Sequence, residues 1–353
     1  MSTEKAEPQG PPEVAPAKGT EIGVLRPTDA PESLEAWNSF VDESPQGCIF
    51  CRSWWLNTVC PGSWEILLLR RGGRIIAGLP LVPRRAHGFR VATMPPLTQT
   101  LGVLLAPPRS ESYEKRLSAD MEATSELLAA LPRFAYFSVK CHGNFTNWLP
   151  FYWQGYRQTT VYSYALEDLS DLEKVFASFA HAKRKNIKKA ESEVTVREDL
   201  AAREFYDNHQ MTLAAQGEQI SYSFDFFERI YKTTHERGAG KTWWATDAAG
   251  NIHAAIFIIF DARSAYYLIS TIDPRFRNSG AATLLVKKAL EYVAPRTKRF
   301  DFEGSMIQGV EQSFRKFGAV QKPYFVISKD NLPFPLKLAA ALFFPKWRTM
   351  LGL

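Results

Sequence analysis

The segment YYLISTIDPRFRNSGAATLLVKKALEYV (residues 266–293) changes its hydrophobic period halfway along. It begins as an apolar strand that ends near Thr271 and continues, after a loop of small and polar residues, as an amphipathic helix from Ala281. The N–H groups in the first turn of a helix lack intrahelical partners, and the helix dipole adds partial positive charge there. We therefore expect an anion, of the phosphate type, to bind at this loop.

The loop itself supports this expectation through two residues. Arg277 adds a fixed cation, and Gly280 allows the backbone to approach phosphate oxygens closely. The alternative is an ordinary strand-to-helix turn that Asn278 or Ser279 caps. The predicted anion-binding residues are Arg277, Asn278, Ser279, Gly280, Ala281 and Ala282.

Outward from this segment, the first half of the chain reads as alternating helices and strands. A hairpin is predicted around the Gly72-Gly73 turn, because paired glycines suit the left-handed conformation of tight hairpin turns. The predicted helices are 31–43, 111–131 and 147–154, and the predicted strands are 64–70, 74–82, 134–140 and 156–166.

The second half repeats this plan. A hairpin over residues 241–260 is followed by strand 265–271, helix 281–294, strand 299–303, helix 310–317 and strand 323–329. Trp64 and Trp243 each accompany a hairpin, and FYWQGY (151–156) and FRKFGA (314–319) each end a helix with a glycine before a strand. We predict an α/β protein of two similar units, each a mixed twisted sheet flanked by helices. The expected division is a disordered tail 1–20, units 21–166 and 167–330, and an apolar segment 331–353.

Composition limits the class of protein. The 353 residues are 45% hydrophobic and 13% aromatic, which is ample for packed cores, and the net charge of +6 suits an anionic ligand without requiring nucleic acid. The N-terminus has no apolar run of the secretory kind, so a cytoplasmic location is expected. Cys48 and Cys51 have metal-type spacing but no second pair, and we expect buried reduced thiols and no metal.

The C-terminal segment PFPLKLAAALFFPKWRTMLGL (333–353) has an apolar run too short to span a bilayer. One interpretation is a helix packed on the second unit. The other is contact with the inner face of the membrane, because Lys337, Lys346, Trp347 and Arg348 interleave with leucine and phenylalanine.

Several motifs resemble a known superfamily. Arg277-x-x-Gly280-x-Ala282, between a strand and a helix, resembles the pyrophosphate loop of GNAT-superfamily acetyltransferases, and FRKFGA resembles the helix of that family that ends Tyr-x-Lys-x-Gly-Phe. RKNIKKA (184–190) is similar to the Arg-x-Asn-Ile-x-x-Ala helix of FemAB-like proteins, which contain two GNAT-like units in tandem. DFEGSM (301–306) looks like a bacterial branch of that group.

The resemblance implies an N-acyltransferase that uses acetyl-CoA or another acyl-CoA as donor and no metal. The expected acceptor is a primary amine of a cell-envelope or polysaccharide precursor, as a small molecule or linked to a nucleotide. Two alternatives stay open. The first is the aminoacyl-tRNA-dependent peptidyltransferase activity of FemAB-like proteins, with tRNA as a partner, and the second is a non-catalytic GNAT-like binding module.

The basic helix at residues 181–194 is assigned to the acceptor. Lys183 and Arg184 lie one turn before Ile187 and share its core-facing side, whereas the outer lysines 185, 188 and 189 are expected in solvent, Lys189 paired with Glu193. By the resemblance, Arg184 matches an arginine that contacts acceptor phosphates. FemAB-like proteins often carry a lysine in the turn that contains Phe314 here, and Arg315 and Lys316 are the nearest candidates for it.

Glu303 is the predicted general base. It ends a strand on which Asp301 and Glu303 share the face opposite Phe300 and Phe302, and burial there would raise its pKa. The alternative is a structural ion pair with Arg299 or a nearby lysine.

The remaining catalytic assignments are weaker. Ser305 and Tyr324 are predicted to orient the substrate. Phe314 stands where the superfamily often has a tyrosine general acid, so the proton donor for the leaving group is unassigned.

Overall fold

A computed structural model describes residues 19–304 and 306–332. Ser305, nearly all of the expected N-terminal tail and all but two residues of the expected C-terminal segment lie outside the described residues. Within those ranges no helix is both long and apolar enough to cross a membrane.

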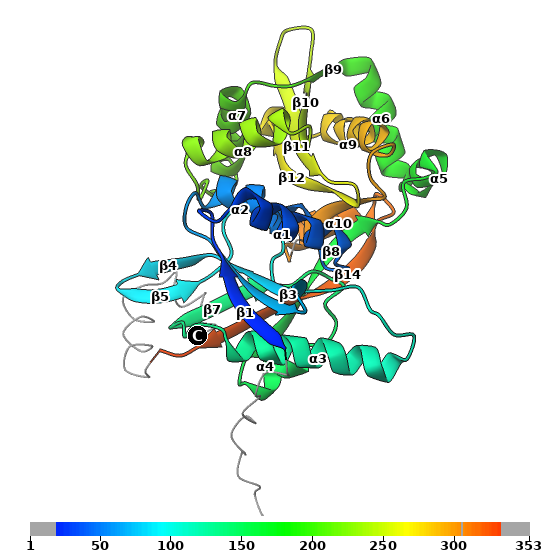
Figure 1. Cartoon of the computed structure of the whole chain (residues 1–353). Coiled ribbons are helices and arrows are strands. Elements are labelled where there is room, and N and C mark those ends of the chain that lie inside the picture. Colours follow the sequence, from blue (N-terminus) through cyan, green and yellow to red (C-terminus); the bar gives the residue numbers. More distant parts are fainter. Residues whose placement is uncertain (1–18, 305, 333–353) are drawn as a thin grey trace, which may run out of the picture.

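The first half, residues 19–166, contributes strands to two sheets and contains four of the described α-helices, α1 to α4. Figure 1 shows their arrangement. Its elements are β1 (Thr20–Leu25), α1 (Pro31–Glu43), η1 (Ile49–Cys51), α2 (Ser53–Val59), β2 (Glu65–Arg71), β3 (Arg74–Leu81), β4 (Pro83–Ala86), β5 (Phe89–Ala92), β6 (Leu104–Leu105), α3 (Tyr113–Ala129), β7 (Tyr136–Lys140), α4 (Leu149–Trp153) and β8 (Arg157–Leu166).

The second half, residues 167–332, begins with two helices and contains the strand and the helix that the segment 266–293 predicted, as β12 and α9. Its elements are α5 (Leu172–Ser178), α6 (His181–Glu193), β9 (Thr195–Glu198), α7 (Ala202–Ala214), α8 (Phe224–Glu236), β10 (Gly240–Thr246), β11 (Ile252–Phe260), β12 (Ser264–Ile272), η2 (Pro274–Phe276), α9 (Ala281–Val293), β13 (Arg299–Gly304), α10 (Gln308–Arg315) and β14 (Val320–Asp330).

One large sheet runs through both halves. Its order is β4-β5-β7-β14-β8-β13-β12-β11-β10-β9, while β1, β2, β3 and β6 form a separate four-stranded sheet. Strand β14, from the end of the second half, lies between β7 and β8 of the first half, and β8 in turn pairs with β13. The halves are therefore joined by hydrogen-bonded strands, and the division at residue 166 stays a prediction about the sequence.

The second-half part of this sheet alternates its side chains between two helix layers. Trp243, Ile256 and Ile258 face the cluster that contains α9 and α6, whereas Phe257 and Ile259 face the cluster that contains α7 and α8. This alternation follows from the period of two along a strand. It fixes α9 against the sheet, with its first turn at the end of β12.

The predicted turns and caps are confirmed. Gly72 and Gly73 join β2 to β3 with φ of +56° and +74°, values that an L side chain rarely adopts. Gly155 and Gly318 follow α4 and α10 with φ of +77° and +75°, and β8 and β14 begin two residues later. The two halves thus share these local features.

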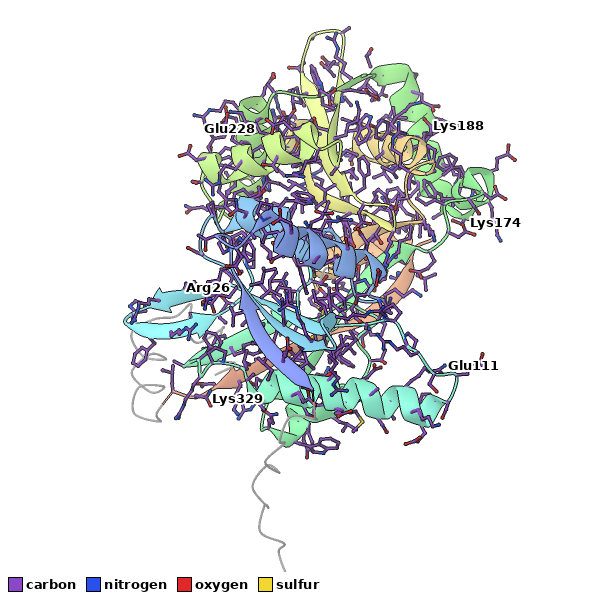
Figure 2. All side chains as sticks on the ribbon, viewed as in Figure 1. Arg26, Glu111, Lys174, Lys188, Glu228 and Lys329 are labelled. Atoms are coloured by element: carbon purple, nitrogen blue, oxygen red, sulfur yellow. The ribbon has the colours of Figure 1, made fainter. Side chains whose placement is uncertain are left out.

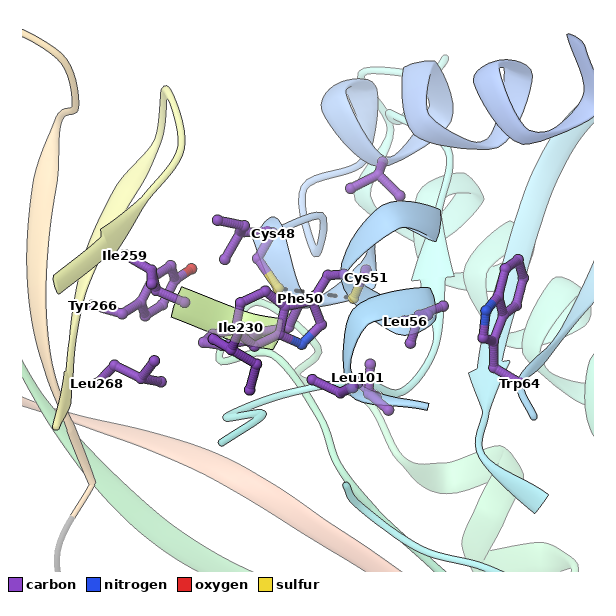
Figure 3. Packing of buried hydrophobic residues seen from close by; sticks show 14 of the residues in the cluster. Cys48, Phe50, Cys51, Leu56, Trp64, Leu101, Ile230, Ile259, Tyr266 and Leu268 are labelled. Carbon is purple, nitrogen blue, oxygen red and sulfur yellow. Dashed lines mark hydrogen bonds between the residues drawn. The ribbon is translucent and has the colours of Figure 1, made fainter. Parts of the chain in front are cut away.

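A shared core also joins the halves. Figure 3 shows Phe50, from η1, beside Tyr266 of β12, with ring centroids 4.7 Å apart. Cys48 and Cys51 are buried in the same cluster as free thiols with 3.8 Å between their sulfurs. The expectation of buried thiols holds for these two and for Cys141, whereas Cys60 is partly exposed.

Replacing Phe50 tests the shared core. Phe50→Ala should lower the free energy of unfolding by about 3–5 kcal/mol, because it leaves a cavity between the two halves. Tyr113, whose exposed fraction is 70%, provides the control: Tyr113→Ala should change stability by about 0.5 kcal/mol or less. Urea unfolding should show one transition for all three proteins, and a first half that unfolds separately would contradict the shared core.

Candidate active site

Strands β12 and β13 pair only briefly. Their parallel ladder comprises three register pairs, from Ser264 opposite Arg299 to Tyr266 opposite Asp301. Beyond them β12 continues to Ile272 and β13 to Gly304, where it pairs with β8 on its other side. The two strands therefore separate and leave an opening in the sheet from Tyr267 onward.

A cavity of about 390 Å³, here called the β12–β13 cavity, lies at this opening. Its walls come from α6, α7, β12, the loop before α9, α9 itself and the α10 region. Lys183 and Arg277 are the charged side chains among its described lining residues, so the cavity is cationic. The lining residues are Lys183, Thr212, Leu213, Ala215, Gln216, Tyr267, Ser270, Ile272, Pro274, Arg277, Ala282, Thr283, Val286, Gly309, Val310, Ser313, Phe314 and Phe317.

The first turn of α9 faces this cavity through Ala282 and Thr283. The N-cap residue of α9 is Gly280, which offers no capping side chain, and the Ser279 hydroxyl before it accepts a hydrogen bond of 3.2 Å from the Ala281 N–H. No acceptor among the described residues takes the Ala282 N–H. The Arg277 side chain is exposed and forms no ion pair with a carboxylate of the described residues. Capping thus leaves donors available for an anion.

Gly280 has a left-handed backbone, with φ of +81°. A Cβ atom added there would lie 2.3 Å from the carbonyl oxygen of Asn186 in α6. Lys189 of the same helix donates a 2.9 Å hydrogen bond to the Asn278 carbonyl. The space on the Cβ side of Gly280 is therefore taken by α6, and the contact of its backbone with phosphate stays a prediction.

Lys183 is turned inward from α6, as its position before the buried Ile187 predicted. Its Nζ donates a 2.9 Å hydrogen bond to the Ser313 hydroxyl and lies 3.9 Å from the centroid of the Phe317 ring. Burial, and then the charge of Lys316, lower the pKa of Lys183 to about 8. A lysine in this state exchanges its proton near neutral pH.

The structure places the other predicted acceptor cations outside the cavity walls. The expectation that Arg184 faces the core is wrong: its side chain is exposed and donates to the carbonyls of Ala177 and Phe179, at 2.8 and 2.6 Å, at the end of α5. Arg315 pairs with Glu311 at 3.3 Å. Lys316 is exposed. Their roles in acceptor binding stay predictions.

The outer lysines of α6 lie in solvent as expected. Figure 2 shows Lys188 at the outer edge of the molecule, and Lys189 lies 3.8 Å from Glu193. Most of the basic helix is thus a solvated face.

Asp301 occupies the face of β13 opposite the cavity. It is buried, and its carboxylate accepts hydrogen bonds from Gln99 at 3.3 Å, from Ser163, and from Arg299 at 2.7 Å. Phe300 and Phe302 pack on the other face, in the cluster with α9. The predicted alternation along this strand is confirmed.

Glu303 follows on the same strand with a left-handed backbone, φ +61°. The residue is partly exposed, but its Oε1 atom is buried and accepts no hydrogen bond from the described residues. Burial of the carboxylate, and then the charge of Asp301, raise the pKa of Glu303 to about 8 against the opposing charge of Lys140. Arg299 pairs with Asp301 and lies 3.8 Å from Glu167, so the alternative pairing of Arg299 with Glu303 is not formed.

A second cavity, of about 230 Å³, lies on the Asp301 side of β13, and we name it the junction pocket. Arg299 and Lys322 balance Asp301 and Glu167 in its walls, and burial lowers the pKa of His142 to about 4, so that the imidazole is neutral. Both halves line it, through Gln99, Thr100, His142, Gly143, Asn144, Ser163, Glu167, Tyr266, Arg299, Asp301, Lys322, Pro323 and Tyr324.

Tyr324 connects the junction pocket to Glu303. Burial raises the pKa of Tyr324 to about 12, and its hydroxyl lies 2.9 Å from where a Cβ on Gly304 would be. The Glu303 N–H donates to Asp301 at 2.8 Å, so Glu303 lies between two residues of the pocket wall. The charge of Glu303 contributes to the raised pKa of Tyr324, so these two predicted residues lie near each other, and their catalytic roles stay predictions.

Comparison with known proteins agrees with this geometry. The family model described as an acetyltransferase (GNAT) domain matches residues 177–308. These residues form a GNAT-type acetyltransferase domain. The match contains Lys183, the loop before α9 and Glu303, and it ends before Phe314, Arg315, Lys316 and Tyr324. No curated protein sequence matches the chain.

Solved structures extend the likeness beyond the GNAT domain. The crystal structure of FemX is 12% identical with a TM-score of 0.63, over 83% of this chain and 95% of that one. A tandem GNAT protein from the clavulanic acid biosynthesis pathway is 14% identical with a TM-score of 0.52, over 89% of this chain and 99% of that one. The C-terminal domain of a putative lysylphosphatidylglycerol synthetase from Agrobacterium fabrum is 12% identical with a TM-score of 0.52, over 88% and 95%. These likenesses show a tandem GNAT-like fold.

The sequence did not single out two residues of the GNAT domain's cavity. Tyr267 lies at the first position after the β12–β13 pairs, and its ring contacts that of Phe314 edge-on with centroids 6.2 Å apart. Ser313 holds the Lys183 ammonium. Tyr267 could have been found as a residue of the strand that precedes the loop. Nothing in the sequence marks Ser313.

The contact between α6 and the loop can be tested by adding one methyl group. Gly250→Ala is the matched control, because Gly250 has φ of +84° with nothing within 4 Å of its Cβ position, and it should cost about 1–2 kcal/mol through backbone strain alone. Gly280→Ala should cost about 1–3 kcal/mol more, because its Cβ also collides with the Asn186 backbone. Equal losses in urea unfolding would show that α6 does not constrain the loop.

The raised pKa of Glu303 makes a signed prediction about stability. A carboxyl group with a folded pKa near 8 favours the folded state when protonated, so its contribution is complete below the unfolded pKa of about 4.3 and is lost as pH rises through 8. Relative to the wild type, Glu303→Gln should therefore gain stability between pH 5 and 8, by at most about 1.4 kcal/mol per pH unit. A stability difference that does not change with pH in urea unfolding would contradict the buried-carboxyl assignment.

Proposed function

We propose that this protein is an N-acyltransferase that moves an acyl group from acyl-CoA to a primary amine of a cell-envelope or polysaccharide precursor. The observation that carries the proposal is the β12–β13 cavity, which opens where the strands separate and has the first turn of α9 in its wall. Its described lining residues include two cations and no carboxylate. This arrangement suits a ligand that is polyanionic at one end and apolar along its length.

The donor's position follows from the charges. Arg277 and the free Ala282 N–H would bind the diphosphate, since both are donors at the mouth of the first helical turn. Ile272 and Val286 supply apolar walls beside which the arm of CoA would lie. The thioester would then reach the opening beside Tyr267.

The acceptor's position follows from the opposite face of β13. The junction pocket pairs its cations with carboxylates, so it suits a hydroxyl-bearing amine without further charge, such as an amino sugar unit. The Glu303 N–H donates to Asp301 in the wall of this pocket, and the Glu303 carboxylate would remove a proton from the ammonium group. Its pKa near 8 makes it a base of suitable strength at mildly alkaline pH.

Aminoacyl-tRNA is the second candidate donor, and one observation favours it. Arg184 and Lys188 are exposed on α6, the helix that lines the β12–β13 cavity through Lys183, and exposed cations of this kind bind phosphate backbones. The β12–β13 cavity favours the CoA donor, because it accommodates a narrow arm within the domain.

A charge placed in the first turn of α9 tests the donor site. Ala282→Asp should weaken acetyl-CoA binding about tenfold to a hundredfold, because its carboxylate would repel the negatively charged diphosphate. The fold should be preserved, because the helix dipole favours Asp in the first turn. Ala282→Asn has the same shape without the charge and should weaken binding much less. Isothermal titration calorimetry measures all three.

Three outcomes would change the proposal. Equal affinities for the Asp and Asn variants would move the diphosphate elsewhere. Binding of charged tRNA in place of any acyl-CoA would favour the peptidyltransferase. A wild type that binds acyl-CoA but transfers its acyl group to no amine, amino sugars included, would favour the non-catalytic binding module.

A further inference from the structure

The proposed reaction needs a proton donor that the sequence did not assign. When an amine attacks a thioester, the carbon–sulfur bond breaks and the sulfur leaves with the electron pair. Phe314, where the superfamily often has a tyrosine, has no proton to donate. The donor must therefore come from another side chain that reaches the β12–β13 cavity.

Two side chains in the cavity wall are acids that could donate near Phe314. One is the Tyr267 hydroxyl, whose pKa burial raises to about 12. The other is the Lys183 ammonium, which reaches the cavity from α6 and is held by Ser313, the residue directly before Phe314. The same ammonium lies over the Phe317 ring, with Nζ 3.9 Å from the ring centroid.

We propose that Lys183 is the general acid that protonates the leaving sulfur, in place of the missing tyrosine. The inference rests on the proposed function, because it requires a thioester in the β12–β13 cavity. Its geometric basis is that a side chain from another helix delivers an N–H group to the turn of α10 where the tyrosine would stand. Ser313 fixes the direction of that group by accepting one of its three protons.

The step balances without any further reactant. The amine nitrogen, after Glu303 has taken a proton from its ammonium form, forms a bond to the acyl carbon. The carbon–sulfur bond breaks, its electron pair goes to sulfur, and Lys183 transfers a proton to that sulfur to give the thiol. The nitrogen loses a proton to water, and Lys183 and Glu303 return to their starting states with a net release of one proton.

The surroundings of Lys183 agree with this role. The charged or titratable groups that face it are Lys316 at the end of α10, Arg277 before α9 and Tyr267 on β12; no carboxylate among the described residues lines the cavity with it. Burial and Lys316 place its pKa at about 8, close to that of an alkyl thiol. Proton transfer to sulfur is then nearly balanced in energy, which is the favourable condition for general acid catalysis.

The main competing role for Lys183 is binding of donor phosphate. A phosphate contact would act on affinity, whereas a general acid acts on the chemical step. The two roles also differ in their dependence on the leaving group, because an aryl thiolate is a weak base that leaves without a proton.

The experiment compares the wild type with Lys183→Met, Lys183→Arg and Lys185→Met, using glucosamine as acceptor and either acetyl-CoA or an acetyl aryl thioester as donor. With acetyl-CoA, Lys183→Met should lower kcat by about 10²–10⁴-fold, while its Kd for acetyl-CoA by calorimetry changes less than about threefold. With the aryl thioester the same variant should approach the wild-type rate. Lys185, exposed on the outer face of α6, is the control, and its variant should behave as the wild type with both donors.

The arginine variant and the pH profile separate a proton from a charge. Lys183→Arg keeps the charge but cannot release a proton at neutral pH, so it should remain slow with acetyl-CoA. The wild-type kcat should fall as pH rises past about 8, where Lys183 loses its proton, and this fall should be absent from the residual activity of Lys183→Met.

The inference is overturned if Lys183→Arg restores full activity, if both donors lose the same factor, or if Lys183→Met raises Kd with kcat unchanged. A wild type that uses no acyl-CoA overturns the proposed function itself and this inference with it. Melting temperatures of the variants within a few degrees of the wild type show that the fold is retained.

Discussion

Strands β12 and β13 hydrogen-bond over three register pairs and then separate, and the site depends on this early separation. A continued ladder would fill the sheet and leave no opening behind Tyr267. The separation is possible because each strand has another neighbour: β11 pairs with β12 along most of its length, and β8 pairs with β13 at Gly304. These neighbours bond the outer edges of β12 and β13 and so hold each strand in the sheet after the ladder between them ends.

Strands of the first half also help to position the opening, because the large sheet combines strands of both halves. β8 stands beside β13, and β14 stands beside β8, so residues from both halves meet on the Asp301 face of β13. The network of Asp301 with Gln99, Ser163 and Arg299 holds this face in place. On the other side of the opening, α6 holds the loop before α9 through Asn186 and Lys189. The RKNIKKA helix and the loop that resembles the GNAT pyrophosphate loop therefore meet in one contact.

The local structure was predictable from the sequence wherever a short-range pattern decides it. Helix α1 matches its predicted bounds, helix α9 ends one residue early, and the Gly72-Gly73 hairpin formed because its turn requires two left-handed residues. The inward position of Lys183 followed from its spacing to Ile187. Glu303 and Asp301 followed from the period of two along β13, and the raised pKa of Glu303 followed from burial.

What the sequence could not predict depends on contacts between distant segments. The insertion of β14 between β7 and β8 is a choice of partner strand, which no local pattern encodes. Helices α7 and α8 were missed, although the Ser223 cap and the helical spacing of the buried Phe227, Ile230 and Thr234 mark α8. Arg184 donates to backbone carbonyls of α5, and every residue has a carbonyl, so the sequence offers no signal for that partner. The contact of Gly280 with Asn186 of α6 is of the same kind, because the two residues lie far apart in the sequence.

The central claim is that the β12–β13 cavity binds an acyl-CoA donor with its reactive end at the opening. A crystal structure of the protein with an acetyl-CoA analogue in which a methylene group replaces the sulfur tests it most directly. We expect the diphosphate beside Arg277 and the Ala282 N–H, and the acetyl carbonyl beside Tyr267 and Phe314. An analogue bound in the junction pocket, or bound on the surface with the β12–β13 cavity empty, would contradict the account.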